Sequence, residues 1–419
     1  MYIGLRISSI PQIIIVKNQR KDNKHMSKKV ETPYSKVRVL LIEGRARQVM
    51  PLMESLHKLG CNVTTYNSSK LDMGYVSHYP DRKVLSYCDS NDPEKSWEAI
   101  SKELKTKKYD LVIPLNDFVA IMLSQHKEEL KPYVSIAAND WDVFQYASDK
   151  LKTMKVCMEN DIPCPKTFIA DENLNDLEKL DLQYPICIKP RTGYSAVGFR
   201  MIDDPEQLKH IVEATKDKYG APLIQEYIPQ TDLQYKAELY VDRNGEVKSC
   251  CIFSKVRWYP INGGSSTLNM SVHRPDIRES CEKLLQAIGW RGYADIDLIQ
   301  DPRDNKAKIM EINPRITGSV KLCYSCGVNF SEQILQDYLG LPVTEYMDYP
   351  EGKYLRYLHT DLLWFLKSPT RFSCKPSWFD FRHSVDQIWS AKDPLPWFAY
   401  TMANITKVKA DSKKRKLDS

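Results

Sequence analysis

The strongest constraint on the fold is a regular alternation of apolar runs and amphipathic stretches over residues 37–140. Three apolar runs predict buried strands: Val37–Glu43, Cys61–Tyr66 and Asp110–Pro114. Three segments that follow them have helical periodicity: 45–59, 96–108 and 119–130. Alternating strands and helices predict a parallel sheet with helices on both faces.

The first turn of this Rossmann-like unit lacks the spacing of a dinucleotide-binding site. The turn Glu43-Gly-Arg-Ala-Arg47 contains one glycine, whereas the dinucleotide fingerprint is G-x-G-x-x-G. Several glycines are needed there so that the backbone can approach a pyrophosphate closely. The sequence therefore argues against a dinucleotide site in residues 37–140.

A different pattern begins at Ile186, where strand-like runs are separated by turn signals. The expected strands are Ile186–Lys189, Leu223–Tyr227, Ala237–Val241, Val247–Phe253, Ala294–Leu298 and Ala307–Ile312. The expected helices are Asp149–Glu159, about 204–218 and about 276–288. The hairpin signal Asp242-Arg-Asn-Gly245 indicates antiparallel pairing, so this part is expected to be an α+β region. Residues 346–406 are expected to form an aromatic-rich C-terminal extension.

The distribution of charge argues against a nucleic-acid-binding protein. The net charge is +6, but residues 1–38 carry +7 and residues 407–419 carry +4, which leaves −5 for residues 39–406. Like-charged blocks at chain ends are usually solvated tails. We therefore expect residues 1–36 to be a disordered or wrongly assigned arm and residues 407–419 to be a disordered tail. A DNA-binding role for Lys413–Lys416 is the less favoured alternative.

Apolar run lengths and cysteine content indicate a cytoplasmic protein. No apolar run approaches the ~18 residues of a membrane-spanning helix, and the N-terminal segment lacks the pattern of a signal peptide. The chain has 11 cysteines, an odd and scattered set that does not suggest a disulfide framework. Cys323 and Cys326 form a lone C-x-x-C, for which free thiols are the favoured interpretation.

Two lysines flank segments that could hold phosphate groups. Lys150 opens a predicted helix, and Lys189 ends a predicted strand. A loop of mostly small residues runs from Pro190 to Gly198, and its backbone N–H groups could surround phosphates while lysine supplies positive charge. The alternative is an ordinary hairpin connection with surface lysines.

The segment Leu223-Ile-Gln-Glu-Tyr-Ile-Pro229 leads from an apolar strand into a polar, aromatic hinge. Backbone groups at such a hinge can pair with the donor and acceptor edge of adenine. The alternative is an edge strand that ends at a proline.

The most informative pattern is a pair of strands with acidic side chains. Residues two apart in a strand face the same side, so Glu311 and Asn313 share a face, as do Asp295 and Asp297. Asp297, Glu311 and Asn313 would supply the oxygen ligands that Mg²⁺ prefers, with nucleotide phosphates completing the shell. The alternative is the solvent-facing side of an antiparallel sheet.

With these motifs in this order, the chain resembles the ATP-grasp superfamily of carboxylate–amine ligases, in the branch of carbamoyl-phosphate synthase and biotin carboxylase. The resemblance runs from about Val37 to Leu341. It implies a fold that combines α/β and α+β parts. A Rossmann-like pre-ATP-grasp domain would occupy residues 37–140, and an ATP-grasp domain with two α+β subdomains clasping ATP would occupy residues 141–345.

The resemblance also assigns roles to residues. It implies ATP-binding roles for Lys150, Lys189, Ser195, Gln225, Glu226, Tyr227, Ile228 and Asp232, with Gln234 as the alternative to Asp232 for the ribose. It implies that Asp297, Glu311 and Asn313 hold two Mg²⁺ ions, with Mn²⁺ as an alternative metal. Arg315 would face the γ-phosphate and the acyl phosphate. Lys255 and Arg257 would help to bind substrate and phosphate, unless they belong to a solvated strand end.

The implied activity is that of an ATP-dependent ligase. A small-molecule carboxylate would be activated as an acyl phosphate and joined to an amine, with release of ADP and phosphate. The expected setting is cell-surface polysaccharide or small-metabolite biosynthesis, and homodimers are common in the superfamily. The alternative is a non-catalytic, regulatory nucleotide-binding protein on the same fold.

Overall fold

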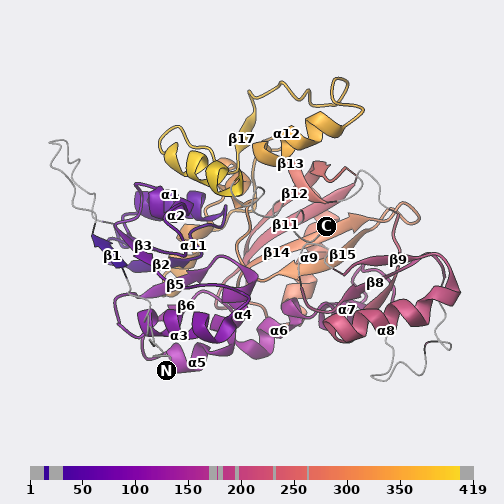
Figure 1. Cartoon of the computed structure of the whole chain (residues 1–419), viewed down its shortest axis with the longest axis horizontal. Helices are drawn as coiled ribbons and strands as arrows, with labels where there is room; N and C mark the ends of the chain where they lie inside the picture. Colours follow the sequence, from indigo (N-terminus) through magenta and orange to yellow (C-terminus); the bar gives the residue numbers. More distant parts are fainter. Residues whose placement is uncertain are drawn as a thin grey trace, which may run out of the picture. The chain divides into compact units, whose positions relative to one another are not determined.

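The computed structural model describes residues 14–17, 32–168, 177, 183–193, 198–229, 233–261 and 264–405 (Figure 1). Its contacts divide these residues into two compact units. The first unit contains residues 14–17, 32–122, 128–136 and 389–405, and the second contains residues 123–127 and 137–388. The described helices include none that is long and apolar enough to cross a membrane.

The first unit contains a six-stranded sheet in the order β1-β4-β3-β2-β5-β6. Its strands are β1 Ile14–Lys17, β2 Arg38–Ile42, β3 Asn62–Asn67, β4 Arg82–Leu85, β5 Leu111–Pro114 and β6 Ser135–Ile136. The neighbours from β4 to β6 pair in parallel, and β1 pairs antiparallel with β4. The parallel sheet expected for residues 37–140 is therefore confirmed. β1 lies inside the segment that was expected to be an arm.

Helices follow the strands of the first unit in the expected order. They are α1 Val49–Lys58, α2 Met73–Val76 and α3 Pro93–Leu104, and α4 Asp117–Gln125 and α5 Lys127–Leu130 lie at the boundary between the units. The helix expected over 119–130 is thus two helices with His126 between them. The short strands β4 and β6 were not predicted, because four and two residues are too few to show a strand period.

The second unit contains a small antiparallel sheet in the order β7-β10-β8-β9. Its strands are β7 Thr167–Phe168, β8 Ile186–Pro190, β9 Arg200–Ile202 and β10 Pro222–Glu226. The helix α8 Leu208–Tyr219 packs on this sheet through a core that includes Ile188, Val212 and Ile224. The helices α6 Trp141–Ser148 and α7 Lys150–Glu159 precede the sheet in sequence.

A seven-stranded sheet forms the rest of the second unit, in the order β15-β14-β11-β12-β13-β16-β17. Its strands are β11 Gln234–Val241, β12 Val247–Tyr259, β13 Ser265–Val272, β14 Gly292–Gln300, β15 Ala307–Asn313, β16 Tyr354–Arg356 and β17 Ser384–Asp386. All neighbours are antiparallel except β16 and β17. Its helices are α9 Pro275–Ala287, α10 Val320–Ser325, α11 Phe330–Tyr338 and α12 Leu358–Lys367.

The predicted C-terminal extension is divided between the two units. β16 and β17 extend the seven-stranded sheet, so residues 346–388 belong to the second unit. The segment 395–405 is helical and belongs to the first unit, where the buried Asp393 before it accepts a hydrogen bond from the Ser77 hydroxyl at 2.5 Å. The basic tail 407–419 lies outside the described residues. All eleven cysteines are free thiols, as expected.

Candidate functional site

Three neighbouring strands of the seven-stranded sheet align charged side chains in two rows. In one row Lys236 on β11 pairs with Asp297 on β14, which pairs with Glu311 on β15. In the other row Glu238 pairs with Asp295, which pairs with Asn313. Cross-strand partners point to the same side of a sheet, so all six side chains share one face. We call this set the polar face.

A lysine from the next strand completes the polar face. Lys255 on β12 lies two residues from Phe253, the cross-strand partner of Lys236, so it points to the same side. Its Nζ lies 2.7 Å from Asp297 Oδ1. Asp297 also accepts a hydrogen bond from Asn313 Nδ2 at 3.0 Å, and the Lys236 Nζ lies 3.5 Å from its Oδ2. The structure therefore brings the predicted residues Lys255, Asp297 and Asn313 together.

The charges around Asp297 keep its carboxylate ionised. Burial alone would raise its pKa, but the ammonium groups of Lys236 and Lys255 and the Asn313 hydrogen bond hold that pKa well below its usual range. Lys236 also lies 2.5 Å from Asp295 Oδ2. Burial would lower the pKa of Lys236, but the two aspartates raise it above its ordinary value, so the lysine stays protonated.

The polar face is most deeply buried at Glu238 and most open at Glu311. The side chain of Glu238 is inaccessible to solvent, and it accepts hydrogen bonds from Thr317 Oγ1 at 3.3 Å and from the Cys323 thiol at 3.2 Å. Burial, aided by the nearby Asp295, raises the pKa of Glu238 to about 7. The side chain of Glu311, in contrast, is 33% exposed. A ligand would therefore approach the polar face from the side of Glu311.

Lys150 joins the N-terminus of α7 to this open end. Asp149 caps the helix by accepting a hydrogen bond from the Leu151 N–H, and its carboxylate pairs with the Arg191 guanidinium. The Lys150 ammonium lies 3.2 Å from Glu311 Oε2 and donates a hydrogen bond to the Gly193 carbonyl oxygen at 2.8 Å. Lys150 therefore contacts both Gly193, which follows β8, and Glu311 on β15.

Lys189 on β8 is electrostatically linked to the same group of residues. Burial lowers the pKa of its ammonium, and the nearby Lys150 adds to this effect, whereas Cys187 and Glu311 oppose it. The residue is half-buried, and its ammonium is close enough to both Lys150 and Glu311 for their charges to act on it. An anion bound beside Lys189 would favour its charged form and so oppose the effect of burial.

The predicted hinge connects β10 with the start of β11. The Gln225 side chain is fully buried and donates a hydrogen bond to Thr167 Oγ1 at 2.7 Å. Burial would raise the pKa of Glu226, but hydrogen bonds from the Lys166 N–H and from the Arg303 and Lys308 side chains lower it. The Gln225 amide nitrogen and the Glu226 carboxylate are thus engaged by the protein, so the backbone of the hinge is the better candidate to pair with a base.

A family profile described as an ATP-grasp domain matches residues 147–319, which carry Lys150, Lys189, the hinge and the polar face. Residues 147–319 form an ATP-grasp domain. The resemblance inferred from the motifs is therefore confirmed, and the match begins just before α7.

Curated relatives of the chain are ligases. The chain is 27% identical over 253 residues to D-aspartate ligase of Enterococcus faecium (strain Aus0004), which covers 56% of this chain and 59% of the ligase. It is 29% identical over 186 residues to D-alanine–D-alanine ligase of Carboxydothermus hydrogenoformans (strain ATCC BAA-161 / DSM 6008 / Z-2901), which covers 40% of this chain and 58% of that ligase. The chain thus spans less than two thirds of the length of either relative.

Solved structures with a similar fold cover about three quarters of the chain. Biotin carboxylase from Campylobacter jejuni matches with a TM-score of 0.64 at 15% identity, over 76% of this chain and 75% of that chain. N5-carboxyaminoimidazole synthetase from Staphylococcus aureus matches with a TM-score of 0.59 at 15% identity, over 78% of this chain and 82% of that chain. L-amino acid ligase from Bacillus licheniformis matches with a TM-score of 0.56 at 18% identity, over 73% of this chain and 74% of that chain. These similarities confirm the predicted combination of α/β and α+β parts.

The other residues predicted to bind ATP or phosphate lie in several different places. Arg315 follows β15 and is half-buried. Tyr227 and Ile228 lie in the hinge, where Ile228 is buried. Ser195 and Asp232 lie outside the described residues. Gln234, the alternative to Asp232, accepts a hydrogen bond from Lys255 at 3.5 Å.

Arg257 does not lie on the polar face of the ATP-grasp domain, which corrects its pairing with Lys255 as a substrate-binding residue. A β-bulge separates the two residues, because Lys255 pairs with Asn269 and Arg257 pairs with the adjacent Leu268. Adjacent partners point to opposite sides, so the Arg257 side chain is on the other face of the sheet. There its guanidinium is buried and bonds to both carboxylate oxygens of Asp361, at 3.0 and 2.9 Å.

Lys236 was not predicted, although it is the cation that contacts both aspartates of β14. The sequence does contain a signal, because Lys236 and Glu238 alternate with apolar residues in the run Tyr235–Val241. That run places two charged residues on one face of a strand that is otherwise buried. The pairing of this strand with β14 was needed to connect the signal with the acidic residues.

The residues of the ATP-grasp domain fit a hard divalent cation. Among the described residues, no group of three His, Cys, Asp or Glu side chains is arranged to hold a metal by itself. The predicted set contains two carboxylates and one amide, which leaves coordination positions for phosphate oxygens and water. The buried Asp297 Oδ1 forms an ion pair with the Lys255 ammonium at 2.7 Å. A metal ion bound by this oxygen would take the place of the lysine.

Proposed function

We propose that this protein is an ATP-dependent ligase that activates a carboxylate as an acyl phosphate and joins it to an amine. The observation that carries the proposal is the approach of Lys150 to Glu311, which places a cation suited to phosphate beside a carboxylate suited to Mg²⁺. The ligase relatives support the same class of reaction.

The lysines of the site would bind the triphosphate. Lys150 is paired with Glu311, and Lys255 is paired with Asp297. We propose that Lys150 and Lys189 bind the α- and β-phosphates, so that Glu311 is released to bind a metal. The backbone of residues 225–228 would hold the adenine, and Arg315 would face the γ-phosphate.

We propose that Asp297, Glu311 and Asn313 hold Mg²⁺, as two ions with Mn²⁺ as an alternative. When bound, Mg²⁺ would neutralise part of the phosphate charge and orient the γ-phosphate. Lys236 would keep Asp297 ionised, and Asn313 would fix its orientation through the 3.0 Å hydrogen bond.

The residues would align two displacements. A substrate carboxylate oxygen attacks the γ-phosphorus, the bond to the bridging oxygen breaks, and ADP leaves. An amine nitrogen then attacks the acyl carbon, phosphate leaves with the acyl C–O electron pair, and the nitrogen loses a proton. Lys150, Lys189 and Arg315 would balance the negative charge that develops on the transferred group. Fixing donor and acceptor in one orientation lowers the entropic cost of both steps.

The relatives suggest where to look for the substrates. Two relatives are named for D-aspartate and D-alanine, so we propose that amino acids are among the carboxylates or amines. We also propose a cytoplasmic location and a homodimer. Cell-surface polysaccharide or small-metabolite biosynthesis is the proposed setting.

An ADP-release screen would test the activity directly. The purified full chain is incubated with MgATP and pairs of amino acids or other carboxylates with amines, and ADP and phosphate are measured together. The proposal expects release that depends on both substrates and is lost in the E311Q/N313A double variant. ATP binding without stimulated release across the panel would instead favour the regulatory nucleotide-binding protein. Release that the double variant retains would rule out the proposed metal site.

A further inference from the structure

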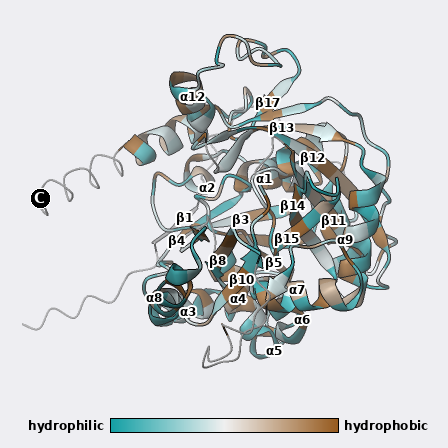
Figure 2. Cartoon of the chain, turned by 90° about the vertical axis from the view of Figure 1, so that its right-hand side faces the viewer, coloured by the Kyte–Doolittle hydropathy of each residue, from teal (hydrophilic) through white to brown (hydrophobic). Residues whose placement is uncertain are grey.

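A lobe at the β17 end of the seven-stranded sheet exposes apolar side chains on an otherwise packed helix. This lobe, residues 358–383, consists of α12 and the loop that follows it (Figure 1). Asp361 and Trp364 are buried on the inner face of α12, whereas Leu362, Leu363 and Leu366 are between 41% and 60% exposed. Leu362 and Leu366 are one turn apart and share a face. Hydrophobic residues are visible along α12 in Figure 2, and an outer helix face that exposes three leucines is expected to contact a partner.

Three phenylalanines of the loop add to this surface. Phe372, Phe379 and Phe381 are between 49% and 75% exposed. Phe372 and Phe379 pack edge-on against Phe365, with ring centroids 5.5 and 5.6 Å apart, and Phe381 packs edge-on against Trp378 at 5.8 Å. Contacts with Phe365 and Trp378 orient the three exposed rings, which remain accessible on their outer sides.

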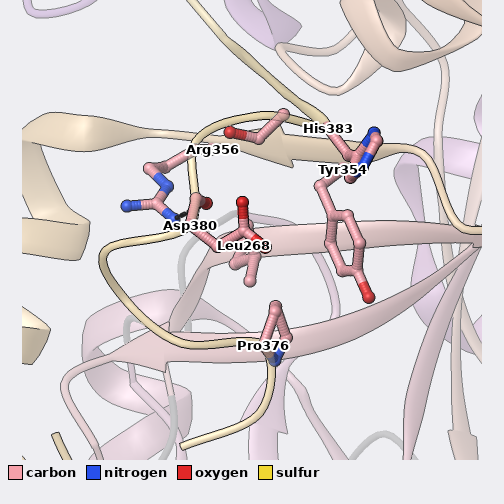
Figure 3. A pocket seen from close by; sticks show the side chains of 7 residues that line it. Leu268, Tyr354, Arg356, Pro376, Asp380 and His383 are labelled. Carbon is pink, nitrogen blue, oxygen red and sulfur yellow. Dashed lines mark hydrogen bonds between the residues drawn. The ribbon is translucent and has the colours of Figure 1, made fainter. Parts of the chain in front are cut away.

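The base of the lobe is firmly attached to the sheet. The Asp361 carboxylate binds the Arg257 guanidinium from β12 and accepts a hydrogen bond from Thr267 on β13 at 2.8 Å. A cavity between the loop and the sheet has a volume of only about 20 Å³. Figure 3 shows Arg356 and Asp380 on one side of it and Tyr354 and His383 on the other. This volume holds about one water molecule, so a ligand of the lobe would bind on its outside.

The apolar side chains are surrounded by positive charge. The lobe contains four cations, Lys367, Arg371, Lys375 and Arg382, and two acids, the buried Asp361 and Asp380, which gives a net charge of +2 without its histidines. Residues 39–406 as a whole carry −5, so the positive charge is a local property of this lobe. Leucine and phenylalanine side chains beside lysine and arginine are the composition of segments that lie in a membrane interface.

We propose that the lobe is a docking surface for an anionic lipid bilayer. The leucines and phenylalanines would enter the boundary between headgroups and acyl chains, and the four cations would contact anionic headgroups. The helix α12 has 10 residues and is too short to span a bilayer, so it would lie in the plane of the interface. A second copy of the chain is a poorer occupant, because a two-fold contact through this surface would place like charges against one another.

The test uses flotation of the full chain with phosphatidylcholine vesicles, with and without phosphatidylglycerol. We expect binding only when phosphatidylglycerol is present, and about tenfold weaker binding at high salt because surface charges are screened. The variants K367E/K375E and L366S/F372S/F379S should each reduce the bound fraction at least tenfold, since one surface cation contributes roughly fivefold. The matched control L71S/L341S removes exposed leucines elsewhere and should bind like the wild type.

Circular dichroism and light scattering of the same samples make the result decisive. All variants should keep the wild-type spectrum, because the changed side chains are exposed. The proposal is overturned if the wild type does not float with either vesicle, or if the two lobe variants bind as well as the control. It is also overturned if the wild type is a dimer that L366S/F372S/F379S converts to a monomer without any vesicle binding, because the lobe would then be a self-association surface.

Discussion

The Lys150 ammonium lies 3.2 Å from the Glu311 carboxylate, which joins the first residue of α7 to strand β15. Each side chain has its own local support. Asp149 caps α7, and the pairing of Asp297 with Glu311 sets the position of β15. The contact therefore depends on the start of α7 and on the register of the seven-stranded sheet at the same time.

Replacing Glu311 by Gln should remove ATP turnover while the fold is kept. The change leaves the shape of the side chain but removes the charge that we propose holds Mg²⁺, so the rate should fall about 10²–10³-fold, as for the loss of one electrostatic contact to a reacting group. Steady-state ADP release measures the effect. E282Q, at a surface ion pair of α9 with Arg278, is the matched control and should keep the wild-type rate. A rate in E311Q equal to that of E282Q would exclude Glu311 from the site.

Lys236→Met should destabilise the second unit strongly. Asp295 and Asp297 would lose the buried cation that contacts both, and an uncompensated buried charge costs about 3–5 kcal/mol. Urea unfolding followed by circular dichroism measures the free energy. K248M removes a lysine that pairs at the surface of the same sheet and should cost less than about 1 kcal/mol. Equal losses in the two variants would contradict a special role of Lys236.

Lys255 and Arg257 should respond to substitution in opposite ways. K255M removes a cation of the polar face and should weaken ATP binding and turnover about tenfold or more, with a modest effect on stability. R257M leaves Asp361 buried without its main partner and should cost about 3 kcal/mol of stability. The folded R257M protein should bind ATP as the wild type does in calorimetry. Weaker ATP binding by R257M at a temperature where it is fully folded would restore Arg257 as a site residue.

Glu238 should make the stability of the protein depend on pH. Its pKa in the folded protein is about 7, above the 4.5 of an unperturbed glutamate, so between these values the folded state holds a proton that the unfolded state has released. The free energy of unfolding should therefore be highest below pH 4.5, as far as Glu238 contributes, and fall as the pH rises to about 7. The contribution is at most about 3 kcal/mol. E238Q removes this component, so urea unfolding at several pH values should show a flatter profile. Parallel profiles would contradict the raised pKa.

The fold was largely predictable because its local patterns are clear. Val39 to Ile42 are all buried in β2, and the apolar run that predicts this strand contains them. Asp149 before α7 and Gly245 after Asp242 mark a helix start and a hairpin turn by their own chemistry. The strands β16 and β17 were missed, since three residues each show no period, and they are strands only because β16 pairs with β13 and β17 pairs with β16.

The candidate site was predictable where alternation is regular. Asp297, Glu311 and Asn313 share a face in the structure because β14 and β15 pair without interruption between Asp295 and Asp297. The predicted placement of Arg257 beside Lys255 was wrong for the opposite reason. One extra residue in β12 turns the Arg257 side chain to the other face of the sheet. Lys236 was missed because its importance comes from a partner 59 residues away.

The sequence by itself determined the strands and helices that have a clear local period and the short runs that carry the acids, lysines and hinge, because these properties depend on residues close together in the chain. Only the tertiary structure decided which of these groups meet. It placed Lys150 beside Glu311 and Lys236 between two aspartates, and it turned Arg257 to the other face of the sheet to anchor α12 through Asp361. Strand register and one β-bulge determine these contacts. Both depend on pairing between segments that are distant in the sequence, so no local pattern predicts them.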